Sequence, residues 1–262
     1  MLSNIGKKWR FWWLIAGVFL RLILMPITFH PDLWVFVSSG YIFASKGVFN
    51  IYDYIVNLPK DSIFILSIGN VYEYFIYPPL AYFVFGLFFL VIKPFISPEF
   101  VPHLWQNSAL IFLDRNLFLN LFLFKLPYLF IDIATAFFLS DLFDKESHKR
   151  LAFILWMFNP LALYTTFMVG QFDLIPTFFV ILALFFAKNK KFAMSILSLG
   201  IGGSFKMFPL LLIIPSAFIF GKNFSDKIKY VLAGFTPFIL TIEEVLRIGP
   251  FLHSLRLLAF GD

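Results

Sequence analysis

The chain has 262 residues, of which 60% are hydrophobic and 21% aromatic, whereas only 14% are charged. An ordinary soluble domain carries roughly 25% charged residues, so this composition and the mean hydropathy of +0.86 exclude a soluble globular fold. The net charge of +6 does not indicate a nucleic-acid partner, because the cations form small groups between apolar segments. The absence of cysteine excludes disulfides, thiolate metal sites and cysteine nucleophiles.

The N-terminus carries a short cationic segment followed by an apolar run over residues 11–28, a pattern that resembles a secretory signal sequence. The run is long for a signal sequence, and no cleavage motif of small residues follows it. We therefore expect a first membrane span that is retained.

Further apolar stretches of 14 to 22 residues recur along the chain. Each would form a helix of roughly 20 to 33 Å, close to the hydrocarbon thickness of a bilayer. The sequence therefore predicts an all-α, polytopic transmembrane helical protein with about seven to nine spans in a single membrane domain over residues 1–262. The apolar segments are 11–28, 79–96, 122–143, 151–169, 172–187, 192–205, 207–221 and 228–245.

Twelve of the 21 cations lie in four short connectors, at residues 7–10, 145–150, 188–191 and 222–229. By the positive-inside rule these connectors are cytoplasmic. Residues 29–78, the turn 170–173, the turn 204–208 and the chain end at Gly261-Asp262 are then expected on the extracytoplasmic side. Residues 79–120 must cross the membrane an even number of times or re-enter, and the sequence leaves both possibilities open.

Residues 29–78 form a loop of roughly fifty residues that is rich in aromatic side chains. Loops of this length are usually functional or disordered, and aromatic residues at this density favour burial at the membrane interface. We expect an interfacial helix over Leu33–Ser45 that is capped by Asp32. Pro79 suits the first turn of the apolar helix that follows.

Ionisable and polar groups within or beside spans are costly, which makes them candidates for function. Each also has a purely structural interpretation, as a helix cap, an interfacial anchor, an internal salt bridge or a solvated loop. Lys125 and Asp132 lie seven residues apart on one helix face, with backbones about 10 Å apart, so each is expected to have other partners. The candidate site residues are Asp32, Glu73, Tyr77, Lys125, Gln171, Asp173 and Lys206.

The order and spacing of these motifs resemble those of the GT-C glycosyltransferases, which use polyprenyl-phosphate sugars on the extracytoplasmic face of a membrane. The chain is particularly similar to the first mannosyltransferase of glycosylphosphatidylinositol assembly and to its prokaryotic relatives. The motifs that carry the resemblance are Arg21, Asp32 with residues 33–36, Tyr77 with residues 78–81, Lys125 with Asp132, residues 156–160, residues 170–173 and Lys206 with residues 207–209.

The resemblance implies transfer of a hexose, with mannose favoured, from a polyprenyl-phosphate donor to a lipid-, glycan- or protein-linked acceptor. Asp32 is the expected catalytic base that takes the proton of the acceptor hydroxyl. Lys206, with Lys125, is expected to stabilise the phosphate leaving group. The enzyme would sit in a prokaryotic plasma membrane with its active site facing outward.

The remaining candidates are assigned to substrate binding. Gln171 and Asp173 would orient sugar hydroxyls, and Glu73 with Tyr77 would line the entrance. The family's first loop usually carries two acids separated by one residue, but here His30 stands at the first of these positions. No metal ligand and no cofactor is therefore assigned. If the activity required a cofactor, a divalent metal ion would be the candidate.

Two alternatives come from other functional classes. One is a transporter or flippase for a lipid-linked sugar, and the other is a non-catalytic subunit of a transferase complex with a partner subunit in the membrane. Members of the resembled family are commonly longer, so the chain is expected to be short at its C-terminus. A transport assay together with a sugar-transfer assay would separate the three possibilities.

Overall fold

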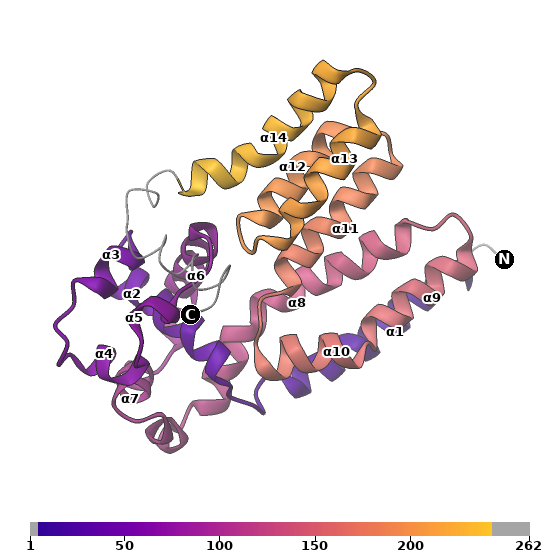
Figure 1. The fold of residues 1–262 in the computed structure, drawn as a ribbon. Coiled ribbons are helices and arrows are strands. Elements are labelled where there is room, and N and C mark those ends of the chain that lie inside the picture. Colours follow the sequence, from indigo (N-terminus) through magenta and orange to yellow (C-terminus); the bar gives the residue numbers. More distant parts are fainter. Residues whose placement is uncertain (1–4, 243–262) are drawn as a thin grey trace. The chain divides into compact units, whose positions relative to one another are not determined.

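The computed structural model describes residues 5–242, and the regular structure of this part of the chain is entirely helical (Figure 1). The prediction of an all-α membrane protein is confirmed. Two compact units divide the chain: the first contains the residues up to Phe29 and Lys125–Pro237, and the second contains His30–Phe124 with the described residues from Phe238 onward. Each unit is described separately, and the single membrane domain stays a prediction.

The first unit contains the long N-terminal helix and most helices of the second half of the chain. Helix α8 begins in the second unit and continues into the first, and α14 begins in the first unit and has its last residues, from Phe238, in the second. The elements are α1 (Ile5–Leu24), α8 (Leu117–Asp141), α9 (Glu146–Met157), α10 (Pro160–Ala162), the π-helix η4 (Leu163–Val169), α11 (Leu174–Lys188), α12 (Phe192–Gly203), η5 (Phe208–Leu212), α13 (Ile213–Phe220) and α14 (Phe224–Ile242).

Two stretches of the described chain are long and apolar enough to cross a bilayer, namely α8 and the run Glu146–Val169, which comprises α9, α10 and η4. A third candidate is the pair Pro79–Phe95 and Phe100–Gln106, which is bent by 113° and is either a broken span or a re-entrant loop. Helices α11 and α12 and the segment Phe208–Phe220 are apolar but shorter. The predicted last span, 228–245, overlaps α14, and its final residues and the chain end at Gly261-Asp262 lie outside the described residues.

Close helix contacts hold the first unit together. Helix α1 packs along α9, as Figure 1 shows, and α11 packs along α12. Helix α12 approaches α14 at a pair of glycines, because a Cβ atom on Gly200 would lie only 2.1 Å from the carbonyl oxygen of Gly234. Small residues at such a crossing let two membrane helices approach to backbone contact.

Polar contacts join the connectors at one end of this unit. Arg10 forms an ion pair of 2.8 Å with Asp141, and Trp9 Nε1 donates to Glu146 at 3.0 Å. Lys188 Nζ donates to Asp144 Oδ1 at 2.7 Å, and this ammonium group holds the pKa of the Asp144 carboxyl below its usual value. Three of the four cationic connectors predicted to be cytoplasmic therefore meet.

The second unit consists of short helices around two longer ones. Helix α2 packs along α6, where Gly40 lies against Phe89 and Gly86 lies against Phe43. Pro79 is the first residue of α6, as expected. The elements are α2 (Pro31–Lys46), α3 (Ile51–Val56), α4 (Ile63–Ile68), α5 (Val71–Tyr74), α6 (Pro79–Ile92), η2 (Lys93–Phe95), α7 (Phe100–Gln106) and η3 (Ser108–Leu113).

Candidate functional site

The core of the first unit contains a fully buried ion pair. Arg21 on α1 donates through Nε to Asp132 Oδ2 on α8 at 2.6 Å, and both side chains are 0% exposed. The second carboxylate oxygen of Asp132 accepts the indole N–H of Trp156 at 2.9 Å. Asp132 thus pairs with Arg21 of a neighbouring helix and not with Lys125. An internal salt bridge was the structural interpretation considered for Asp132.

The guanidinium of Arg21 also binds the end of a helix. Its Nη1 donates to Gly17 O at 2.9 Å and to Met157 O at 2.7 Å, and Met157 is the last residue of α9. The ring of Phe167 lies 5.1 Å from the guanidinium carbon. Nη2 is buried without a hydrogen-bond partner in the described part of the chain. Arg21 therefore satisfies a carbonyl group that α9 leaves free where it ends.

Lys125 is fully buried and binds carbonyl groups. Its Nζ donates to Thr28 O and Met168 O, each at 2.7 Å, and lies 3.4 Å from Thr28 Oγ1. The Thr28 hydroxyl also donates to Met168 O. No ion pair found within residues 5–242 involves Lys125. Lys125 thus ties the segment after α1 to the end of the π-helix η4.

The helical run Glu146–Val169 needs these contacts because it is interrupted. Pro160 has no backbone N–H, and the side chain of Asn159 caps the restarted helix by accepting from the amides of Leu161 at 2.9 Å and Ala162 at 3.4 Å. The run ends at Gly170, whose φ of 88° is a left-handed conformation that favours glycine. Arg21 and Lys125 bind carbonyl groups on either side of this irregular segment.

Two predicted site residues, Lys206 and Asp173, meet just after this segment, and a third, Gln171, lies two residues before Asp173. Lys206 Nζ lies 2.5 Å from Asp173 Oδ1, and the two side chains are 40% and 43% exposed. The backbone N–H of Gln171 donates to Thr165 O at 2.9 Å. The turn 170–173 and the turn that contains Lys206 are therefore in contact, and the charge of Lys206 is paired with a carboxylate.

The second unit places Asp32 differently from the prediction. The N-cap of α2 is His30, whose Nδ1 accepts from the Asp32 backbone N–H at 3.3 Å, so the prediction that Asp32 caps this helix is wrong. The shift has a simple cause: Pro31 occupies the first helical position, where its missing N–H costs nothing. Asp32 lies in the first turn, 3.6 Å from His30 Nδ1, with a partly exposed side chain.

Glu73 and Tyr77 belong to the same unit. Glu73 lies on the short helix α5 and accepts from Asn70 Nδ2 at 2.7 Å, while Asn70 caps that helix. The carbonyl of Tyr77 accepts from the Tyr52 hydroxyl. Tyr74, which lies between Glu73 and Tyr77 in the sequence, is buried, and burial raises the pKa of its hydroxyl. This hydroxyl donates to Val35 O at 3.2 Å. The aromatic segment is folded into the unit, in agreement with the expectation that it is ordered.

The seven predicted site residues thus belong to two groups. Those in the first unit are Lys125, Gln171, Asp173 and Lys206, and those in the second are Asp32, Glu73 and Tyr77. The sequence analysis did not predict that Thr28 would contact Lys125 or that Trp156 would donate to Asp132. The signal for the Arg21 cluster was present, since an arginine within an apolar span requires a partner. Among the residues described, no group of three or more histidine and acidic side chains is arranged to hold a metal ion.

One comparison with known proteins gives a match. The family model described as GPI transamidase subunit PIG-U matches residues 75–247, about two thirds of the chain. Neither the curated proteins nor the solved structures gave a match. The predictions of a GT-C glycosyltransferase and of a mannosyltransferase activity are wrong, because the match is to a transamidase subunit and no glycosyltransferase family matches. The chain belongs to the family of the GPI transamidase subunit PIG-U.

Proposed function

We propose that this chain is a non-catalytic, membrane-embedded subunit of a transamidase complex that attaches glycosylphosphatidylinositol to proteins. The observation that carries the proposal is the match of residues 75–247 to the PIG-U family. The match favours the second alternative considered from the sequence, a non-catalytic subunit of a complex, over sugar transfer by this chain. The polyprenyl-phosphate donor and the sugar acceptor have no support in the match.

The chemistry of the buried polar groups agrees with this role. The charge of Arg21 is paired with Asp132, and Arg21 and Lys125 also donate to backbone carbonyl groups. These contacts stabilise the helices of the first unit. The sequence contains no cysteine, so a thiolate nucleophile for an amide exchange would have to come from another chain. These groups support a structural role within a complex.

Among the predicted site residues, Gln171, Asp173 and Lys206 have a role in this proposal. They lie in two turns of the first unit. The ion pair between Asp173 and Lys206 is partly exposed, whereas Arg21, Asp132 and Lys125 are fully buried. A partly exposed charged pair suits the polar rim of an interface with a partner subunit. We assign this pair to contact with another subunit on the extracytoplasmic side.

The location in a membrane follows from the apolar helices and the family. The outward orientation of the turns at 170–173 and 204–208 is part of the proposal and rests on the distribution of cations. The predicted prokaryotic plasma membrane was tied to the glycosyltransferase resemblance, and the family match gives it no support.

The test is depletion of the chain in its own cells together with a reporter protein that carries a GPI attachment signal. We expect depletion to abolish attachment of GPI to the reporter, and the tagged chain to migrate on native gels with a partner that carries the catalytic nucleophile. Asp32→Asn should restore attachment as well as the parent does, because Asp32 is no general base in this role. Attachment catalysed by the purified chain alone would overturn the proposal.

The assigned contact is tested separately. Lys206→Met removes the charge and retains much of the apolar stem, so we expect the chain to fold but to lose most of its co-migration with the partner. Lys222→Met, in a connector expected on the cytoplasmic side, is the matched control and should leave co-migration unchanged. Equal co-migration of both variants would assign the contact to another surface.

A further inference from the structure

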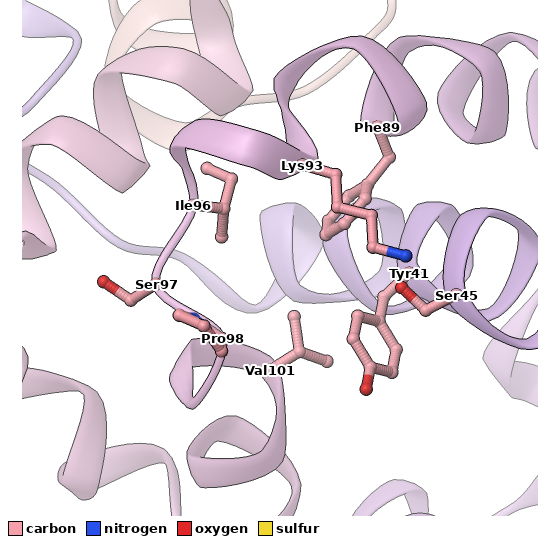
Figure 2. A pocket seen from close by; sticks show the side chains of 8 residues that line it. All are labelled: Tyr41, Ser45, Phe89, Lys93, Ile96, Ser97, Pro98 and Val101. Carbon is pink, nitrogen blue, oxygen red and sulfur yellow. The ribbon is translucent and has the colours of Figure 1, made fainter.

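A pocket of about 240 Å³ lies within the second unit, at the bend between α6 and α7 (Figure 2). The lining is apolar over most of its surface, with a cation and three hydroxyl-bearing side chains. The lining residues are Tyr41, Ser45, Phe89, Lys93, Ile96, Ser97, Pro98 and Val101. None of these residues is among the candidate site residues predicted from the sequence.

The walls of the pocket are fixed by packing. A Cβ atom on Gly40 would lie 2.9 Å from Phe89 Cβ, so α2 and α6 are in close contact beside the pocket. The ring of Tyr41 lies 6.0 Å from that of Phe89 and 5.4 Å from that of Trp105, edge-on in both cases. Trp105 in turn donates to Ser38 Oγ at 2.9 Å. These contacts hold the aromatic wall in place without a ligand.

A polar network holds the bend itself. Ser97 Oγ donates to Asp114 Oδ1 at 2.9 Å, and Asn120 Nδ2 lies 3.2 Å from Asp114 Oδ2. The backbone N–H of Ser97 donates to Asn120 Oδ1 at 3.3 Å, and Asn120 is fully buried. Because these groups satisfy one another, Ser97 contributes shape to the pocket and the network makes the bend a rigid feature.

The opposite end of the pocket offers donors that are free for a ligand. Lys93 Nζ makes one long hydrogen bond, of 3.3 Å, to Ala44 O, and it forms no ion pair within the described part of the chain. Figure 2 shows this ammonium group and the hydroxyl of Ser45 at the same end of the pocket. Ser45 is exposed and directly follows Ala44. A cation and a hydroxyl at the rim of an apolar pocket favour an anion with an apolar extension.

The surroundings of the pocket indicate where the ligand comes from. Leu90, Val91 and Phe95, on the same bent segment, are 45%, 69% and 65% exposed, which suits contact with lipid chains in a membrane protein. The volume is below the roughly 300–1,000 Å³ of sites that enclose a whole drug-sized ligand. The pocket is therefore sized for one part of a molecule whose remainder lies in the bilayer.

We propose that this pocket binds an anionic phospholipid of the surrounding membrane, with its phosphate on Lys93 and Ser45 and the adjoining apolar part against Phe89, Ile96 and Val101. Lys46, which donates to the Tyr54 hydroxyl at 3.1 Å and lies over the Trp105 ring, adds positive charge to the same helix end. The site is independent of the proposed partner contact, since its residues belong to the second unit.

The experiment uses the purified full chain, freed of lipid in a neutral detergent and titrated with short-chain phosphatidylglycerol. A ligand that binds only the folded state raises the melting temperature with concentration, so the midpoint of the rise gives an apparent affinity. We expect Lys93→Gln to require at least about tenfold more lipid for the same rise, in line with loss of a charged hydrogen bond. Lys60→Gln, at an exposed position in a turn of the same unit, is the matched control and should titrate like the parent.

Two further arms identify the ligand. Phosphatidylcholine of the same chain length should raise the melting temperature less, and inorganic phosphate alone should have no effect. Ser45→Trp, at an exposed rim position where it does not disturb the core, should abolish the response to phosphatidylglycerol even if Lys93→Gln does not fold. The proposal fails if the Ser45→Trp protein responds like the parent, if the two lipids act equally, or if phosphate alone reproduces the effect.

Discussion

Two buried cations in the first unit find their acceptors in different ways. Arg21 has a planar group with several donors, and it binds one carboxylate together with two carbonyl oxygens. Lys125 has a compact ammonium, and it binds Thr28 O and Met168 O without a carboxylate. A buried ion pair adds little stability by itself, but a buried charge that loses its partner is costly. The Arg21 cluster therefore permits a sharp test.

Asp132→Asn should strongly destabilise the chain. The amide retains the shape of the carboxylate but leaves the Arg21 charge buried without a counter-charge. We expect the free energy of unfolding to fall by about 3–5 kcal/mol. The measurement is unfolding of the purified variant and parent in the same detergent. The double variant Arg21→Met with Asp132→Leu should recover much of the loss, because it removes both charges together.

The matched control for this variant is Asp141→Asn. Asp141 is paired with Arg10 at 2.8 Å, but its side chain is 42% exposed. Exposed pairs contribute about 0–1 kcal/mol, so this loss should be small. Equal effects of the two substitutions would contradict the view that burial decides the cost.

At the scale of single residues, the sequence identifies which side chains matter better than it identifies their partners. The spacing of seven places Lys125 and Asp132 on one helix face, yet about 10 Å of helix separates them and each turns to another element. Asp32 was a reasonable N-cap from its residue type, but Pro31 moves the cap to His30. Which partner a side chain binds depends on neighbouring elements, and these are not specified by the segment that carries the side chain.

Among the elements, the interrupted and closely packed helices carry most of the information. The predicted apolar segments correspond to α1, α6, α8 and the later helices within a few residues. The broken run at Asn159-Pro160 was visible as a proline within a span. The π-helix that follows it was not, because its wide turn is stabilised by contacts from Lys125 and Thr28 on other parts of the chain.

The crossing of α12 and α14 leads to a prediction with an internal control. Gly200→Ala would place a Cβ atom 2.1 Å from Gly234 O, a backbone atom that moves only if the helix moves. Gly203→Ala would place it 2.2 Å from Leu210 Cδ2, the flexible end of a side chain. We expect Gly200→Ala to lower the melting temperature clearly more than Gly203→Ala, with both variants measured in one detergent. A larger loss for Gly203→Ala would show that the glycine contact does not set the helix crossing.

For the molecule as a whole, the distribution of cations predicts the topology, and contacts in the first unit agree with it. The connectors expected inside are joined through Arg10 with Asp141 and through Lys188 with Asp144. The turns expected outside are joined through Lys206 with Asp173. The sequence could not decide how residues 79–120 are arranged, since a bend of 113° has no reliable signature in composition.

The bend can be assigned by combining its geometry with this topology. If α8 ends inside at Asp141, it begins outside near Leu117. A broken span ending at Gln106 would then leave only the segment up to Leu117 to cross back to the outside. Six residues of that segment form the 3₁₀-helix η3, about 12 Å long, and the rest add too little to reach the roughly 30 Å of hydrocarbon. We therefore expect α6 and α7 to form a re-entrant loop.

Single cysteines in this cysteine-free chain test that arrangement. Asn107→Cys, at an exposed position directly after α7, should react with an impermeant maleimide from the same side as Asp61→Cys in the first loop. Lys191→Cys, in a cationic connector, should react only after the membrane is opened. The assay uses sealed vesicles whose orientation is set by a marker protein. Labelling of position 107 from the side opposite to position 61 would make the bent pair a true span, and α8 would then have to run in the opposite direction.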